Sequence, residues 1–273
     1  ARFADAEYAA RISERFFDEM IANGTTTAAI YASVHERATD IAFSTAQARG
    51  IRAFIGKVMM DRNSPSALQE RVEDSIAASL RLFEKWDGAA SGRLRYIFTP
   101  RFAAACSMDL MRQTGKIARE RGALVQSHLS ENKDEVEWIR RLFPHSASYA
   151  AVYDEAGLLT DRAIMAHCIH LSPQEIGFLQ SRGTKVAFCP YSNRTLRSGT
   201  MPYRKLRDAG LNISLGTDVA GGPSLSMIDQ MREAIDAAGF VRSTGNTVWW
   251  GSGEARGERC GDAALGWQGT SDA

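Results

Sequence analysis

The hydrophobic residues of this chain recur with two periods that alternate along the sequence. Stretches with apolar residues at helical spacing cover residues 5–22, 38–49, 66–86, 107–121, 131–142, 173–182, 203–209 and 224–238. Between them lie short, almost continuous apolar runs at residues 25–32, 51–58, 94–99, 124–128, 163–167, 185–189 and 213–216. Such runs predict strands that are buried on both faces. Their alternation with helices is typical of a parallel sheet covered by helices.

The order of these elements predicts an α/β fold. We expect a (β/α)8 TIM-type barrel that apparently lacks strand one, because seven strands are predicted and the helix at residues 5–22 has no strand before it. An open, doubly wound sheet is the alternative. The predicted barrel domain spans residues 1–238. Residues 239–273 are rich in Gly and Trp and show little periodicity, so we expect a divergent, poorly ordered tail there.

Composition and charge narrow the possible partners. The chain is 44% hydrophobic and 24% charged, with a formal net charge of +1 and scattered basic residues. This balance predicts neither a nucleic-acid nor a membrane partner. No apolar run approaches the roughly 20 residues that span a bilayer, and the chain does not begin with Met. The cysteines are isolated and predict buried free thiols in the reducing cytoplasm: Cys106, Cys168, Cys189 and Cys260.

Reactive side chains follow four of the predicted strands, and this favours the barrel, where functional groups gather at the carboxyl ends of strands. They are Arg101, His128 with Glu131, His167 and Asp218. Two imidazoles and a carboxylate suit a divalent metal such as zinc, so His128, His167 and Asp218 are the predicted ligands. Bound zinc lowers the pKa of its water from about 15.7 to about 7. Asp218 is the predicted acceptor of the water's proton, and Glu131 the predicted proton shuttle.

Each candidate also has a structural alternative. Asp218 would serve equally well to cap the next helix, and Arg101 to form an ordinary ion pair. His35, after the first predicted strand, either lines the mouth of the barrel or is structural. We expect structural roles for the remaining histidines, His145 and His170.

The sixth predicted strand, at residues 185–189, ends in the segment Cys-Pro-Tyr-Ser-Asn at residues 189–193. Metal ligands are normally oriented by a surrounding layer of hydrogen-bonding groups. We therefore expect Ser192 and Asn193 to brace the pocket rather than to react.

Four segments carry a resemblance to a known family. They are Thr-Pro-Arg-Phe at 99–102, Gln-Ser-His-Leu-Ser-Glu-Asn-Lys-Asp-Glu-Val at 126–136, Met-Ala-His at 165–167 and Leu-Gly-Thr-Asp-Val-Ala-Gly-Gly at 215–222. With these segments the chain resembles the amidohydrolase superfamily and, within it, guanine deaminases, over residues 3–235. The first two segments are the more specific to deaminases that act on guanine.

The resemblance implies an enzyme of purine catabolism. It implies that His128 and Asp218 bind Zn2+, that His167 contacts the bound water or substrate or also binds the metal, and that Asp218 activates the water. Glu131 would move protons to the purine ring, and Arg101 with the backbone of Phe102 would hold the edge of guanine. The reaction would yield xanthine and ammonia. A homodimer is the implied assembly.

The chain also departs from the family pattern. The family places a His-x-His pair on strand one, followed by a glutamine that grips guanine, and this sequence contains no His-x-His. The family's last barrel helix and small β-domain are not recognisable after about residue 235. We therefore expect the isolated chain to be weakly stable and inactive.

Three alternatives stay open at this point. The chain could belong to a related deaminase or chlorohydrolase that acts on another heterocycle. It could be a barrel that binds a purine without turning it over, which the absence of a His-x-His from the sequence ahead of Ala1 would favour. It could also be a purely structural fragment, which aggregation would favour.

Overall fold

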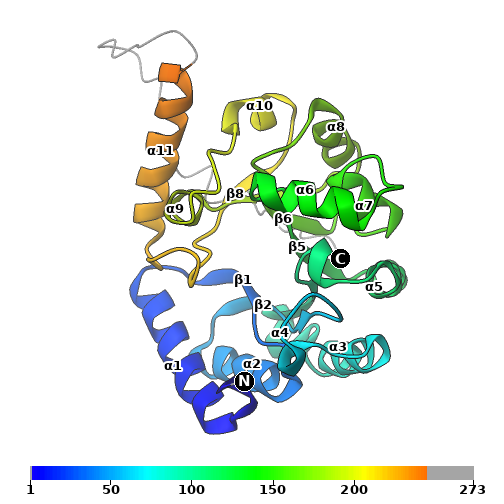
Figure 1. Cartoon of the computed structure of the whole chain (residues 1–273). Coiled ribbons are helices and arrows are strands. Elements are labelled where there is room, and N and C mark those ends of the chain that lie inside the picture. The colour runs from blue at the N-terminus through cyan, green and yellow to red at the C-terminus, as the bar shows by residue number, and fades with distance from the viewer. Residues whose placement is uncertain (1, 245–273) are drawn as a thin grey trace.

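A curved parallel sheet forms the centre of the molecule in the computed structural model, which describes residues 2–244 (Figure 1). The strands are β1 Thr27–Tyr31, β2 Arg52–Gly56, β3 Val58–Met59, β4 Leu94–Pro100, β5 Leu124–Leu129, β6 Ala163–His167, β7 Lys185–Phe188 and β8 Ile213–Leu215. Their order is β1-β2-β4-β5-β6-β7-β8, and β3 prolongs β2 along β4. The path thus holds seven strand positions, as predicted. Among the described residues, β1 and β8 each pair with one neighbour only, so the sheet is open between them.

Helices surround the outside of this sheet (Figure 1). They are α1 Ala6–Ala22, α2 Glu36–Arg49, α3 Val72–Trp86, α4 Ala89–Gly92, α5 Met108–Glu120, α6 Lys133–Leu142, α7 Tyr149–Glu155, α8 Pro173–Ser181, α9 Pro190–Thr195, α10 Tyr203–Asp208 and α11 Met227–Thr244, with the 3-10 turns η1 Arg2–Ala4, η2 Ser66–Leu68 and η3 Ala103–Ala105. Two begin with reciprocal capping boxes, Asn132 with Glu135 and Ser172 with Glu175. No helix of the described chain is long and apolar enough to cross a membrane.

One predicted helix was wrong at its start. The long helix expected over residues 66–86 is a 3-10 turn followed by α3, with extended backbone at Gln69 and Arg71. The reason lies in Glu70, whose carboxylate accepts hydrogen bonds from the fully buried Lys57 amine at 2.5 Å and from Ser75 at 2.9 Å. An unpaired buried ammonium is costly, so this long-range ion pair overrides helical propensity in the segment around Glu70.

Two further boundaries differ from expectation. Helix α9 was not predicted, because six mostly polar residues show no hydrophobic period. Helix α11 continues to Thr244, beyond the predicted domain boundary at residue 238. The rest of the predicted tail, including Cys260, lies outside the described residues. The three described cysteines, Cys106, Cys168 and Cys189, are buried and free, as predicted.

Aromatic side chains fill the space between the sheet and α2 and α3. Phe43 stacks on Trp86 with ring centroids 5.1 Å apart, and Tyr96 meets Phe98 edge to face at 5.1 Å. All four side chains are buried. Burying side chains of this size contributes about 25 cal/mol for each Å² of apolar surface removed from water. This layer holds the first half of the sheet against its helices.

The inside of the sheet is filled by alternate residues of neighbouring strands. A lower layer consists of Phe54, Ile97, Leu124 and the partly buried Ile164. Above it Gly56 faces Thr99, where a side-chain Cβ on Gly56 would lie only 1.8 Å from Thr99 Oγ1. The amide of Gln126 donates to Thr99 Oγ1 at 3.0 Å. These layers form the floor beneath the carboxyl ends of the strands, where the predicted site residues lie.

Candidate metal centre and active site

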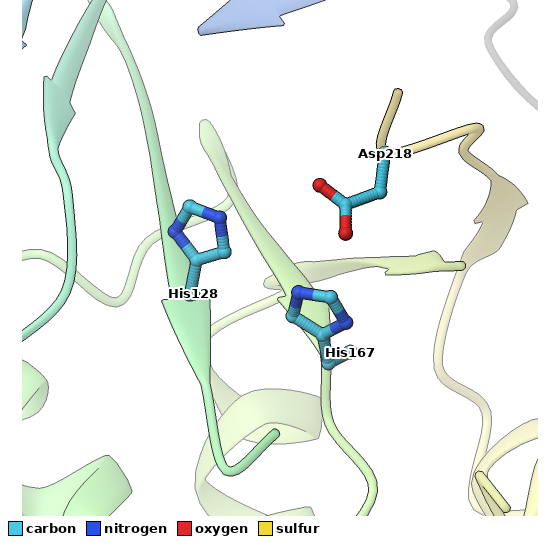
Figure 2. Close-up of side chains that lie close together, drawn as sticks. All are labelled: His128, His167 and Asp218. Carbon is cyan, nitrogen blue, oxygen red and sulfur yellow. The ribbon is translucent and has the colours of Figure 1, made fainter. Parts of the chain in front are cut away.

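Three predicted ligands from three separate strand ends meet at one point. His128 lies near the end of β5, His167 is the last residue of β6, and Asp218 follows β8. One potential ligand atom from each residue lies within 4.8 Å of the others, and Figure 2 shows the three side chains turned toward the same space. The parallel sheet produces this meeting because β5 and β6 are paired in register, His128 opposite Ala166 and Leu129 opposite His167. This arrangement fits the prediction that the three residues are ligands of one metal ion.

The backbone turns sharply where these side chains leave the strands. Four non-glycine residues there adopt left-handed conformations: Ser130 (φ 51°), His167 (φ 71°), Cys168 (φ 51°) and Asp218 (φ 45°). Such conformations cost on the order of 1–3 kcal/mol each, and in proteins they cluster at functional sites. The turn after β6 is held by hydrogen bonds from the Cys168 amide to Leu129 O (2.9 Å) and from the Ile169 amide to Ser130 O (3.0 Å).

The imidazole of His128 is held in one orientation. Its Nδ1 donates to the carbonyl oxygen of Arg101 at 2.5 Å, and because a carbonyl only accepts, the lone pair is left on Nε2. The ring packs against Tyr31, with centroids 4.6 Å apart, and against His167 at 5.5 Å. Burial, and next the neighbouring His167, lower the pKa of His128 from 6.5 to about 4. The ring is therefore neutral at neutral pH, which is the state that binds a metal.

Glu131 lies beside His167 at the edge of the same space. Glu131 Oε2 is 3.8 Å from His167 Nε2, while Oε1 accepts a hydrogen bond from Ser198 Oγ at 3.0 Å. Its backbone amide donates to Glu135 Oε2 at 2.9 Å. His167 is buried, but one fifth of the Glu131 side chain is exposed. A carboxylate with one side in the site and one side near solvent suits the predicted proton transfer.

The segment after β7 braces the other two groups, as predicted for Ser192 and Asn193. Ser192 Oγ donates to Asp218 Oδ2 at 2.5 Å, and Asn193 Oδ1 lies 2.9 Å from His167 Nδ1. Gly221 makes room for the first contact, because a Cβ there would lie 2.7 Å from Asp218 Oδ2. The side chain of Asp218 thus interacts with Ser192 and does not bond a helix N-terminus, which disfavours the capping alternative.

Arg101 stands exposed at the end of β4. Its guanidinium lies over the Phe102 ring at 5.4 Å, and Nη1 is 3.7 Å from the sulfur of Met60. No carboxylate among the described residues forms an ion pair with Arg101, so the ordinary ion-pair alternative is not supported. Phe102 is half-buried and meets Trp138 edge to face at 6.1 Å. The cation is therefore free to meet a ligand from solvent.

The other histidines are not brought into the metal cluster. His35 is the N-cap residue of α2, and burial lowers its pKa. His145 is exposed. His170 is partly buried, and its Nε2 donates to the Ser198 carbonyl at 2.8 Å. His170 thereby holds the same serine that bonds Glu131.

Sequence patterns alone did not reveal the buried support beneath His128. The hydroxyl of Tyr153 donates to His128 O at 2.7 Å, and the hydroxyl of Tyr149 donates to Glu135 Oε1 at 2.7 Å. The carboxylate of Glu135 also accepts the hydrogen bond from the Glu131 amide. These tyrosines lie on α7, which packs on α8 outside the sheet. No local signal distinguishes them from ordinary core tyrosines.

The donor set fits a divalent metal. His128 Nδ1 and His167 Nδ1 are both engaged by oxygen atoms, and Asp218 Oδ2 is engaged by Ser192. Among the described residues, no hydrogen bond reaches His128 Nε2, His167 Nε2 or Asp218 Oδ1. Orientation of each ligand through its second polar atom is the usual arrangement around protein metals. Two imidazoles and one carboxylate are a common ligand set of catalytic zinc.

A parallel barrel sheet with such a cluster at the carboxyl ends of its strands defines a barrel of the metal-dependent hydrolase kind. Comparison with protein families gives the same result: the family model described as "Amidohydrolase family" matches residues 2–245. The chain belongs to the amidohydrolase family.

Individual relatives are guanine deaminases. The chain is 40% identical over 235 residues to guanine deaminase of Dictyostelium discoideum, covering 86% of this chain and 52% of the relative. The crystal structure of guanine deaminase from C. acetobutylicum with bound guanine superimposes with a TM-score of 0.87 at 35% identity, covering 89% of this chain and 58% of that one. An adenosine deaminase from Xanthomonas campestris with bound zinc matches with a TM-score of 0.78 at 25% identity, covering 87% and 52%. The chain spans about half the length of the curated relatives it matches.

Proposed function

We propose that this protein catalyses the hydrolytic deamination of guanine to xanthine and ammonia with a zinc-activated water. The observation that carries the proposal is the cluster of His128, His167 and Asp218, with Glu131 and the exposed Arg101 beside it. Similarity to guanine deaminases over most of the chain supports the choice of substrate. Similarity of fold alone would not support the choice of a particular substrate.

The metal is proposed to be Zn2+, held by His128, His167 and Asp218. The neutral state of His128 and the mixed imidazole and carboxylate donors support this choice over Mg2+ or Ca2+, which prefer oxygen ligands. A relative of the same fold contains zinc. When bound, the ion would lower the pKa of a water molecule to about 7 and so supply hydroxide at neutral pH.

The protein's own carboxylates are proposed to move the protons. Asp218, held in place by the hydrogen bond from Ser192, would accept the water's proton. Glu131 would deliver protons to the purine ring and to the exocyclic amine, which leaves as ammonia. The sum is guanine plus water giving xanthine plus ammonia, so no further reactant is needed. Ser198 keeps the second carboxylate directed to the site through Oε1.

Substrate recognition is proposed to rest on Arg101 and Phe102. A guanidinium offers donors and no acceptor, so Arg101 matches the carbonyl oxygen of guanine and not the amino group of adenine. The backbone of Phe102 would bind the adjacent edge of the ring. His128, Glu131 and Asp218 would contact the reacting side of the purine.

The test uses the protein expressed from its complete gene with Zn2+ and measures ammonia release from guanine and adenine and chloride release from a chlorotriazine. We expect guanine to be the preferred substrate and Glu131→Gln to lower kcat by about 10²–10⁴-fold. Glu137→Gln, an exposed neighbour on α6, is the matched control and should be neutral. A preference for another heterocycle would refute the guanine assignment, and purine binding without any turnover would refute the enzyme.

Three further expectations accompany the proposal. The 273-residue chain by itself is expected to turn over no guanine, because the unpaired edges of β1 and β8 leave its sheet weakly held. Measurable turnover by this polypeptide would contradict that expectation. A cytoplasmic location is supported by the three buried free thiols, and a homodimer stays a prediction for measurement of molecular mass in solution.

A further inference from the structure

One short segment after β7 touches three of the proposed functional groups without supplying any itself. Ser192 bonds Asp218 at 2.5 Å, Asn193 bonds His167 at 2.9 Å, and Ser198 bonds Glu131 at 3.0 Å. These three targets come from different strand ends, so the segment of residues 192–198 joins them. Asn193 is the second residue of this segment.

The contact between Asn193 and His167 is enclosed. Asn193 is 2% exposed and His167 is 1% exposed, so water competes little for their hydrogen bond. The oxygen of an amide only accepts hydrogen bonds. An imidazole that bonds this oxygen through Nδ1 must carry its hydrogen there, and a neutral ring then keeps its lone pair on Nε2.

The backbone of Asn193 is fixed on both sides. Its amide donates to Cys189 O at 2.9 Å, and its carbonyl accepts from the Ser198 amide at 2.9 Å. Helix α9 is also tied to α11, by the ion pair of Arg194 with Glu233 at 2.9 Å. The side chain of Asn193 is therefore presented to His167 by a rigid support.

The other half of the Asn193 side chain has no partner. Its buried Nδ2 makes no hydrogen bond to any described residue. An unpaired buried donor is unfavourable, so stability alone does not account for an amide side chain at this position. The hydrogen bond of Oδ1 with the His167 imidazole is therefore the interaction that explains an amide side chain here.

We propose that Asn193 is a positioning residue that selects the Nδ1–H tautomer of His167 and directs the lone pair of Nε2 toward His128 and Asp218. That this lone pair serves a metal rests on the proposed function. The tautomer itself does not, since it follows from the hydrogen bond alone. The two claims can therefore fail separately.

The test is long-range 1H–15N NMR of the protein expressed from its complete gene with 15N-labelled histidine, metal-free and at mildly alkaline pH. The signals of His167 are assigned by their loss in His167→Gln. We expect a single Nδ1–H pattern in the wild type. Asn193→Asp, whose oxygens can only accept, should keep that pattern. Asn193→Leu, which has no acceptor, should lose it in favour of the Nε2–H form that the side chain of free histidine prefers in water.

Thr195→Ala is the matched control on the same helix. Among the described residues the Thr195 hydroxyl bonds only Tyr191 O, so the tautomer pattern of this variant should equal that of the wild type. The opposite amide orientation would place Nδ2 against the ring and produce the Nε2–H form. In that case the wild type would show Nε2–H and Asn193→Asp would switch it to Nδ1–H, which would overturn the proposal. If Asn193→Leu does not fold, the comparison of wild type with Asn193→Asp still decides. Guanine turnover plays no part in the readout, so failure of the proposed function would leave this result standing.

Discussion

Replacing Gly56 by alanine tests whether the floor beneath the site is as tight as the structure indicates. The added Cβ would lie 1.8 Å from Thr99 Oγ1 and 2.2 Å from the carbonyl oxygen of Ile97. The hydroxyl can rotate away, but it already bonds Ile97 O at 2.9 Å and accepts from Gln126 at 3.0 Å. The backbone carbonyl cannot rotate without leaving the sheet. Strands β2 and β4 must therefore separate by about 1 Å to restore ordinary contact.

The expected cost combines two effects. Overpacking a rigid interior costs typically 1–3 kcal/mol, and losing the hydrogen bonds around Thr99 adds about 1 kcal/mol for each. We expect Gly56→Ala to lower the free energy of unfolding by roughly 3–5 kcal/mol, a large share of the 5–15 kcal/mol typical of domains. Because slopes in urea are about 1–3 kcal/mol per M, the urea midpoint measured by circular dichroism should fall by roughly 1 M or more.

The matched control is Gly177→Ala in α8, where an added Cβ meets nothing within 4 Å. It should raise stability by up to about 1 kcal/mol through helix propensity. The double variant Gly56→Ala with Thr99→Ala should recover only part of the loss, because the Ile97 carbonyl remains in the way. A change below about 0.5 kcal/mol for Gly56→Ala would refute the reasoning. Full recovery in the double variant would assign the clash to the Thr99 side chain instead.

Further predictions concern substrate binding and pH. Arg101→Ala should weaken guanine binding by roughly 10-fold or more, while leaving the free energy of unfolding within about 0.5 kcal/mol, because Arg101 forms no ion pair with any described residue. Calorimetric titration with guanine and a melting curve check both, and unchanged affinity would remove Arg101 from the purine site. Burial raises the pKa of Glu135 above its ordinary 4.5, so the folded chain binds a proton more tightly than the unfolded chain. This contribution to stability is complete below about pH 4.5 and is lost as pH rises through the raised pKa. Unfolding free energies measured across that window should fall with pH more steeply for the wild type than for Glu135→Gln, and parallel curves would contradict the assignment.

The alternation of helices and parallel strands was predictable from the sequence, because hydrophobic periodicity is a local property. The reactive residues were predictable for a related reason. His128, His167 and Asp218 each follow an apolar run, and parallel strands carry their carboxyl ends to one edge of the sheet. Spacing along the chain therefore already placed these side chains on a common rim.

Other features were decided by contacts between residues far apart in sequence. Glu70 bonds the buried amine of Lys57, and the helix that periodicity predicted to begin at residue 66 therefore begins only after Glu70. Helix α9 has too few apolar residues to be recognised, yet its Asn193 bonds His167 from the neighbouring strand.

Only the tertiary structure determines which nitrogen of each imidazole is left free and which oxygen of Asp218 is occupied. These depend on the direction of individual hydrogen bonds from the Arg101 carbonyl, Asn193 and Ser192. Sequence patterns specify which groups reach the rim, because burial and strand direction are encoded locally. The orientation of each group is set by polar partners on adjacent strands and helices, which become neighbours only when the sheet forms.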